Sequence, residues 1–284
     1  MLVEVGPATL SIAGERDGKP FPFDVKAIEA YVGEILGNIR EELPVLKQKA
    51  CRIKKTEWLS EPARRMIRAV KVVDEASLTP MAAVAGTVAD LLKERLTAAE
   101  RFDFLSVNNG GDISLFNAPG RAMRIGIGDI NRNVATPYVL KMEGGGSFGI
   151  ASSGFGGRSF TLGLADVVSV IADSAALADA AATFIANKTT TQADVIVRRK
   201  AGEIDPLTDI PEEMVTVERG ELEEKAVKAA LKSGWEQAAQ LKSIGIIRDA
   251  LVILSDHIMH TIDENSNLRL EEVSHGNQKN SDDC

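Results

Sequence analysis

The sequence predicts an α+β protein in which a mostly antiparallel sheet is flanked by helices. The middle of the chain, residues 102–171, contains short β-rich runs separated by glycine-bearing turns. This pattern is typical of hairpins rather than of βαβ crossovers. Apolar residues recur at helical spacing on both sides of this region. The chain has 284 residues, 44% hydrophobic and 26% charged, which favours a large core and excludes a disordered chain, a collagen or a coiled-coil rod.

Helix signals stand before and after the β-rich region. Asp24 is a suitable N-cap for the first helix, and Pro44 follows its end. Ser60 and Ser174 are suitable caps for the second and fourth. The third begins at Pro80 with small residues, which indicates close approach by another helix or by a ligand. The expected helices are residues 24–43, 60–73, 80–96 and 174–187. The expected strands are residues 2–12, 102–108, 112–116, 121–127, 134–142, 147–152, 166–171, 194–199 and 213–217.

The chain divides into three expected parts. Residues 1–217 form the α+β core, and residues 218–262 form a helical C-terminal region packed on it, with helices at 219–242 and 246–262. Residues 263–284 are polar and aperiodic, which predicts a disordered tail.

Charge and composition narrow the class of partner. Lysine and arginine total 33 and aspartate and glutamate total 41, so the net charge is −8, and nucleic acid is not an expected partner. The two cysteines, Cys51 and Cys284, fit a reducing compartment. The most apolar long stretch is interrupted by Asp173 and Asp179, so no membrane span is expected. Together with the lack of a targeting segment, these observations predict a cytoplasmic protein.

The first candidate site is the sequence NNGGDI between two expected strands. Gly110 and Gly111 allow positive φ, and successive backbone N–H groups in such a turn can bind an anion. Asn109 adds an amide, and Asp112 adds a carboxylate that can bind a hydroxyl, an amine or a metal. The alternative is a hairpin turn whose aspartate caps its own backbone.

The second candidate site is the glycine-rich segment that ends the strand at 147–152. Ser153, Gly154, Gly156 and Gly157 let a phosphate or a flat ring approach the backbone. Arg158 can bind an anion in bidentate fashion. The alternative is a flexible turn. A formal GxGxxG within residues 144–149 precedes a strand rather than a helix, so it does not indicate a dinucleotide fold.

The third candidate site lies on the alanine-rich helix. Asp179 and Thr183 are four residues apart and therefore share one helical face. Their oxygens suit Mg²⁺ rather than zinc. The alternative is a packing helix with a solvated aspartate. All three histidines lie at position 257 or later, so no Ser-His-Asp arrangement can be assembled around these motifs.

Taken in order, four segments resemble the motifs of the ApbE-like flavin transferase family. They are TPMAAVAGTVADLL, FLSVNNGGDI, FGIASSGFGGRSF and VVSVIADSAALADAAATFIAN, and they extend from residue 79 to 188. The last contains the family's ADAxxT pattern. The GxAD sequence from Gly163 to Asp166 resembles an uncharacterised branch of that superfamily.

The resemblance implies an ApbE-like fold and a Mg²⁺-dependent reaction. Family members cleave FAD, pass the FMN phosphoryl group to a threonine or serine hydroxyl of a target flavoprotein, and release AMP. It implies metal binding by Asp179, Thr183 and the backbone of Ala83 or Ala82. It also implies that Gly110, Gly111 and Asp112 face the nucleotide while Ser153, Gly154 and Arg158 line the same cleft, with Asp166 and Arg158 as catalytic candidates.

One segment of the transferases is absent at its usual place. The interval between the serine-glycine motif and the alanine-rich helix lacks a His-x-Ile-Asp-Pro-x-Thr-Gly-like sequence, and Asp166 stands there instead. An IDPLT string at 204–208 follows the helix, and we assign it no role. Three hypotheses therefore stay open. The chain is a Mg²⁺-dependent enzyme on a flavin or other nucleotide-like substrate, a non-catalytic flavin- or nucleotide-binding protein, or an assembly partner. A homodimer is compatible with each.

Overall fold

The computed structural model describes residues 1–129, 134–264 and 266–272. Its main sheet has the strand order β1-β2-β4-β5-β8-β9-β12-β13, with β3 paired to β2. Every neighbouring pair in this sheet is antiparallel. The strands are β1 (Leu2–Val5), β2 (Ala8–Arg16), β3 (Lys19–Pro20), β4 (Phe104–Asn109), β5 (Asp112–Asn117), β8 (Gly146–Ser153), β9 (Val167–Ala172), β12 (Asp249–Leu254) and β13 (His257–His260).

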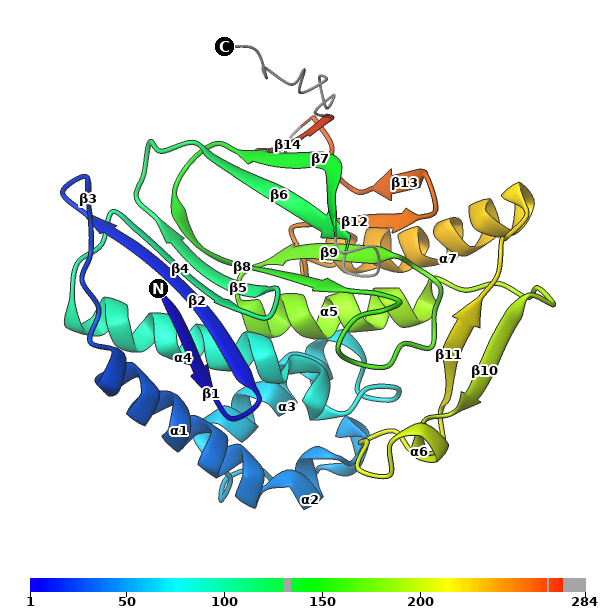
Figure 1. Cartoon of the computed structure of the whole chain (residues 1–284), viewed down its shortest axis with the longest axis horizontal. Coiled ribbons are helices and arrows are strands. Elements are labelled where there is room, and N and C mark those ends of the chain that lie inside the picture. The colour runs from blue at the N-terminus through cyan, green and yellow to red at the C-terminus, as the bar shows by residue number, and fades with distance from the viewer. Residues whose placement is uncertain (130–133, 265, 273–284) are drawn as a thin grey trace, which may run out of the picture.

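Helices cover one face of the main sheet, and a smaller sheet covers part of the other (Figure 1). The longer helices are α1 (Val25–Glu41), α3 (Glu61–Asp74), α4 (Val84–Ala99), α5 (Ala175–Lys188) and α7 (Glu224–Ser243). Short helical segments are α2 (Leu43–Leu46), η1 (Ala50–Arg52), η2 (Pro80–Ala83) and α6 (Ala201–Ile204). The smaller antiparallel sheet has the order β14-β7-β6, with β6 (Met123–Asp129), β7 (Val134–Met142) and β14 (Leu268–Glu272). A separate ribbon pairs β10 (Ile196–Lys200) with β11 (Met214–Arg219).

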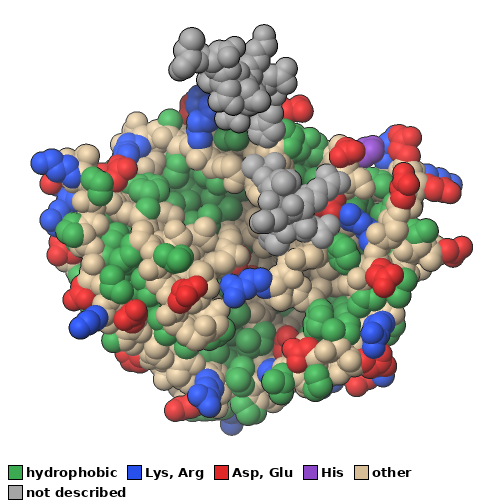
Figure 2. Space-filling view, in the orientation of Figure 1, with side chains coloured by type: hydrophobic (Ala, Val, Ile, Leu, Met, Phe, Trp, Pro, Cys, Tyr) green, Lys and Arg blue, Asp and Glu red, His purple; other side chains and the backbone are tan. Residues whose placement is uncertain are grey.

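The pleat of the central strands distributes apolar side chains between two cores. In β9, Val168 and Val170 pack in the core beneath the helices, whereas Val167 and Ile171 pack in the core beneath the smaller sheet. Successive side chains of a strand point to opposite faces, so a strand covered on both faces is apolar throughout. The surface seen in Figure 2 carries acidic and basic side chains interspersed, with no large area of a single sign.

The α+β prediction is confirmed, with its antiparallel sheet and its flanking helices. The caps at Asp24, Ser60 and Ser174 are also confirmed, because each side chain accepts a hydrogen bond from a backbone N–H in its helix's first turn. The N-terminal run is two paired strands that meet at a turn at Gly6.

The prediction of a helix at 246–262 is wrong. These residues form β12 and β13, and β12 is a central strand between β9 and β13. All of β12 is buried, and its continuous apolar run fits a buried helix as well as a two-sided strand. Only α7 is helical in the predicted C-terminal region.

The predicted disordered tail is wrong over residues 268–272, which form β14 on the edge of β7. Residues 273–284 lie outside the described residues. The proposed division into parts at 217 and 262 stays a prediction, although β12 ties the second part into the main sheet.

Candidate functional site

The site begins where helices α4 and α5 meet with almost no space between their backbones. A Cβ on Gly86 would lie 2.2 Å from the carbonyl oxygen of Ala175, so this position of α4 requires glycine. A Cβ on Gly149 of β8 would lie 2.1 Å from the backbone nitrogen of Ala175. Gly86 therefore serves contact with another helix, one of the two alternatives that the sequence left open, whereas Ala82 and Ala85 of the same run line a cavity.

Each of these two helices supplies a carboxylate to the start of the other. Asp90 of α4 accepts hydrogen bonds from the backbone N–H groups of Ala175 and Ala176, at 3.0 and 2.9 Å. Asp179 of α5 accepts one from the backbone N–H of Gly86, at 3.0 Å. Carboxylates at helix N-termini are stabilised by the unpaired N–H groups and the helix dipole. This exchange fixes Asp179 at the start of α4.

The β4–β5 hairpin brings a second carboxylate to the same place. Gly110 and Gly111 have φ values of +66° and +113°, as the NNGGDI motif predicts for a tight turn. Asn108 closes the turn, because its Oδ1 accepts the N–H of Gly111 at 2.8 Å. Asp112 is consequently not used as the cap of its own turn, and its Oδ1 is buried with no hydrogen-bond partner. The side-chain amide of Asn109 donates to the carbonyl oxygen of Ala85 at 3.2 Å and ties the hairpin to α4.

The carboxyl groups of Asp112 and Asp179 both have raised pKa values. Burial raises the pKa of Asp112 to about 7, and only the backbone N–H of Ser152 opposes the shift. Burial also raises the pKa of Asp179 well above its ordinary value, and the nearby charge of Asp112 raises it further. The N–H groups of Gly86 and Ala85 oppose this second shift. Asp112 and Asp179 are half-buried where they face the cavities. Two adjacent carboxylates each disfavour ionisation of the other, and a cation between them would remove that penalty.

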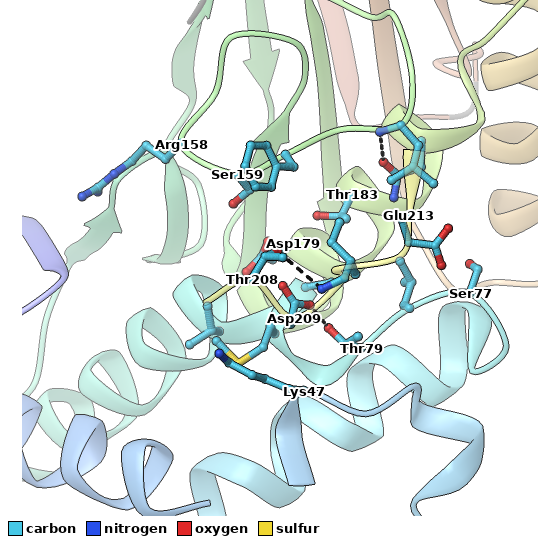
Figure 3. Close-up of a pocket in the computed structure, with 18 of the residues that line it drawn as sticks. Lys47, Ser77, Thr79, Arg158, Ser159, Asp179, Thr183, Thr208, Asp209 and Glu213 are labelled. Carbon is cyan, nitrogen blue, oxygen red and sulfur yellow. Dashed lines mark hydrogen bonds between the residues drawn. The ribbon is translucent and has the colours of Figure 1, made fainter. Parts of the chain in front are cut away.

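Two neighbouring cavities share this acidic pair. One has a volume of about 460 Å³ and the other about 390 Å³. Asp112, Asp179, Thr183 and Arg158 line both. Figure 3 shows Asp179 and Thr183 on one wall of the larger cavity, with Arg158 on a separate loop. The residues that line both are Val84, Ala85, Asp112, Arg158, Ser159, Asp179 and Thr183. Segments far apart in the sequence therefore line two adjoining cavities around the two carboxylates.

The glycine-rich segment forms a wall of the smaller cavity. Ser153, Gly154, Gly157 and Arg158 line it, together with Asn109, Gly110 and Asp112. A Cβ on Gly154 would lie 2.4 Å from the carbonyl oxygen of Asp166, so this glycine allows close packing against the start of β9. Arg158 is exposed, and within the described residues its one hydrogen bond runs from Nη2 to the carbonyl oxygen of Pro7, at a long 3.5 Å. Its guanidinium is thus available to an anion in the cavities.

Several of the predicted site residues line neither of the two cavities. Ala83 is fully buried in the core, whereas its neighbour Ala82 lines the larger cavity. Gly111 and Gly156 belong to the turns but are not among the lining residues of either cavity. Asp166 is 1% exposed and forms an ion pair with Arg219 at 2.6 Å. Its other oxygen accepts the backbone N–H of Ser255 at 2.6 Å, so Asp166 joins β9, β11 and the end of β12.

One wall of the larger cavity is not predicted from the sequence. Five residues of the 205–210 segment line it, and Lys47 and Thr79 donate hydrogen bonds to this segment. The IDPLT string at 204–208 was the available signal, but the order of the chain placed it after the alanine-rich helix. The β10–β11 ribbon returns this segment to the cavity, which no local pattern reveals.

Comparison with protein families decides the assignment. A family model described as AbpE bacteria matches residues 1–263. The chain belongs to this family. The resemblance drawn from the four sequence motifs is thereby confirmed, and this AbpE family member carries all four within the matched region.

Two of the curated relatives that the chain matches are UPF0280 proteins. A UPF0280 protein of Methanosarcina barkeri is 35% identical over 129 residues, which are 45% of this chain and 49% of the relative. A UPF0280 protein of Methanococcus maripaludis is 40% identical over 124 residues, 42% of this chain and 50% of the relative. The AbpE family member thus spans about half the length of the curated relatives it matches.

Solved structures with a similar arrangement include two named flavin transferases. The flavin transferase ApbE from Vibrio cholerae is 13% identical, with a TM-score of 0.47 over 96% of both chains. The apo flavinyl transferase ApbE from Pseudomonas stutzeri is 14% identical, with a TM-score of 0.45 over 92% of this chain and 93% of that one. Family membership rests on the family model.

Two further findings concern membrane-spanning helices and clusters of metal ligands. Within the described ranges, no helix combines the length and apolar character that crossing a membrane requires. In the same part of the chain, no group of three or more His, Cys, Asp or Glu side chains is arranged to hold a metal. A cation at the Asp112–Asp179 pair would therefore need hydroxyl, backbone or ligand oxygens to complete its shell.

Proposed function

We propose that this protein is a Mg²⁺-dependent enzyme that acts on a flavin or another nucleotide-like substrate at the two joined cavities. The observation that carries the proposal is the buried, unpartnered Oδ1 of Asp112 beside the carboxylate of Asp179. Uncompensated buried acidic oxygens are costly, and they are retained where a cation or substrate completes them. The family resemblance, in which ADAxxT supplies metal ligands, supports the same place.

The donor set suits Mg²⁺. Asp112 and Asp179 supply carboxylate oxygens, Thr183 supplies a hydroxyl on the same cavity wall, and Ala82 borders the cavity with its backbone. Hard oxygen ligands with incomplete protein coordination are typical of Mg²⁺, which keeps waters and substrate phosphates as its other ligands. When bound, the cation would neutralise a substrate diphosphate and stabilise charge on a transferring phosphoryl group.

The remaining residues would bind and orient the substrate. Arg158 lines both cavities and has no close partner in the part of the chain that the structure describes, so it would hold an anionic group at their junction. The backbone at Gly110 and Gly154 leaves room for a flat ring in the smaller cavity. Leu36, Val84 and Val88 would supply the apolar contact there. Asp166 is not part of this proposal because it is buried in its ion pair with Arg219.

The test is release of AMP from FAD. The purified protein would be incubated with FAD and Mg²⁺, with a hydroxyl-bearing acceptor or water taking the FMN phosphoryl group, and products would be separated by chromatography. We expect AMP that depends on Mg²⁺ and is lost in Asp179→Asn. The matched control is Asp173→Asn, which changes an exposed aspartate just before the same helix and should keep the activity.

The outcomes separate the hypotheses. Binding of FAD without AMP release would contradict the enzyme and favour the non-catalytic flavin- or nucleotide-binding protein. Absence of FAD binding, with and without Mg²⁺, would exclude FAD as the substrate and leave another nucleotide-like substrate or the assembly role. Mass spectrometry of small molecules released by heating the purified protein would identify a substrate other than FAD.

A further inference from the structure

One segment of the N-terminal half has a charge opposite in sign to that of the whole chain. Residues 52–71 carry seven lysines or arginines and two glutamates, so their net charge is +5, whereas the whole chain has −8. Asp74 and Glu75 follow at the border of the segment. It consists of a loop, residues 53–59, and most of α3, and it lines neither of the cavities around the acidic pair. A role for its charge is therefore separate from the chemistry proposed for those cavities.

The loop lies along one face of α3. The Arg64 guanidinium donates a hydrogen bond to the carbonyl oxygen of Leu59 at 3.0 Å, and the Lys71 ammonium donates one to the carbonyl oxygen of Ile53 at 2.6 Å. Arg64, Arg68 and Lys71 are spaced by four and three residues, so they share one helical face. Arg68 therefore lies between the two contacts that join the helix to the loop.

The basic side chains beside these contacts are exposed. We call Arg52, Lys54, Lys55 and Arg68 the basic patch, and all four are exposed. Within the described ranges, none of the four forms an ion pair or a side-chain hydrogen bond. Their charges are therefore available to a partner outside the chain.

An exposed tryptophan stands in the same loop. Trp58 is 65% exposed, and it directly precedes Leu59, the residue whose carbonyl oxygen binds Arg64. On α3, Val72 is 48% exposed and lies one helical turn after Arg68. The loop and the helix together thus present cations, a large amphipathic ring and a smaller apolar side chain.

We propose that the basic patch, together with Trp58, docks this protein on an anionic lipid surface. Clusters of lysine and arginine are attracted to anionic headgroups, and tryptophan is enriched at the boundary between headgroups and acyl chains. The negative charge of the rest of the chain does not prevent this, because the Debye length at 0.1 M salt is about 10 Å and more distant charges are screened. The inference is independent of the proposed function.

The composition of the patch favours lipid over other anionic partners. Lysine is depleted in protein–protein interfaces, whereas neighbouring lysines without fixed partners suit headgroups that are spread over a plane. A nucleic-acid duplex presents closely spaced phosphates along a longer face, and proteins that bind it are typically basic as a whole. The net charge of −8 is the opposite of that.

Co-sedimentation of the full chain with lipid vesicles tests the proposal. Binding would be measured to equimolar phosphatidylcholine and phosphatidylglycerol, and to phosphatidylcholine alone. We expect binding only to the anionic vesicles, and we expect added salt to weaken it. Lys54→Gln combined with Lys55→Gln should weaken it roughly tenfold or more. The matched control, Lys26→Gln combined with Lys225→Gln, removes two exposed lysines of α1 and α7 that form no ion pair in the described part of the chain, and it should keep the affinity.

Tryptophan fluorescence gives a second readout. We expect the emission to shift to shorter wavelength when anionic vesicles are added, and we expect Trp58→Phe to lose this shift. All the substituted positions are exposed, so each variant should keep the thermal midpoint of the natural protein.

Several results would overturn the proposal. They are equal losses in the two lysine pairs, equal binding to neutral vesicles, an unchanged emission shift in Trp58→Phe, and no binding to anionic vesicles. Binding to duplex DNA or to polyglutamate in place of the vesicles would overturn it too, and would indicate nucleic acid or an acidic protein as the partner.

Discussion

Two carboxylates occupy corresponding places on two facing helices, yet their surroundings differ. Asp90 of α4 is 1% exposed and accepts three hydrogen bonds, two from the start of α5 and one from the Ser114 hydroxyl at 2.5 Å. Asp179 of α5 faces two cavities and has the charge of Asp112 beside it. The carboxylate of Asp90 therefore has hydrogen-bond donors for both of its oxygens. The carboxylate of Asp179 accepts a hydrogen bond from the backbone N–H of Gly86 but has a second carboxylate beside it.

The hydrogen-bond partners of a carboxylate distinguish a structural role from a ligand-binding role. A buried carboxylate whose oxygens are all satisfied stabilises the packing of the elements that donate to it. A buried pair with an unpartnered oxygen costs stability unless something outside the chain completes it. Asp90 therefore has a structural role, and the unsatisfied Asp112–Asp179 pair is the place where we propose that a ligand binds.

The largest expected effect separates these two acids directly. Asp90→Ala leaves three buried donors without an acceptor, at roughly 1–3 kcal/mol for each unsatisfied group. We expect the free energy of unfolding to fall by about 3 kcal/mol or more, measured by urea denaturation of the cation-free protein. Asp179→Asn should leave the free energy of unfolding nearly unchanged. The substitution weakens the cap at the start of α4 but also removes the repulsion between Asp179 and Asp112. Equal losses in the two variants would break the comparison.

A smaller effect tests the helix contact that holds both acids in place. Gly86→Ala puts a Cβ within 2.2 Å of Ala175, and overpacking of this kind costs roughly 1–3 kcal/mol. Its matched control is Gly37→Ala on α1, where no atom lies within 4 Å of the new Cβ. That change should stabilise the protein by up to about 1 kcal/mol. A neutral Gly86→Ala would mean that the two helices are not in close contact.

The dependence of stability on pH sharpens the account of Asp112. Its pKa is raised from 3.8 to about 7, so the folded state binds this proton more tightly than the unfolded state does. The free energy of unfolding of the cation-free protein should therefore fall as pH rises from about 4 to about 7. Asp112→Asn should remove this component from the pH profile, and Asp173→Asn should not. An unchanged profile in Asp112→Asn would show that Asp112 is ionised like a surface aspartate.

Sequence patterns predicted the elements that have one clear period or cap. The hairpin at Gly110, the helix after Ser174 and the shared wall of Asp179 and Thr183 followed from local chemistry. The pattern at β12 failed because a strand buried on both faces has no alternation to detect.

The parts of the site that were missed depend on long-range placement. The position of Asp166 in a motif predicts a catalytic role. Its partner in a buried ion pair, Arg219, lies 53 residues away along the chain and is revealed only by the structure. The 205–210 segment was discounted because its place in the sequence is late, whereas the ribbon that carries it folds back to the cavity. Tertiary partners of this kind leave no periodic signal in a single sequence.

The most direct test of the central claim is cation binding at the Asp112–Asp179 pair. Mn²⁺ shares the oxygen preference of Mg²⁺ and can be counted by electron paramagnetic resonance in a titration with FAD present. The account predicts one bound Mn²⁺ per chain, displaced by Mg²⁺, absent from Asp112→Asn and Asp179→Asn and retained in Asp173→Asn. Undiminished binding in Asp112→Asn and Asp179→Asn, or no bound Mn²⁺ in the natural protein, would contradict it.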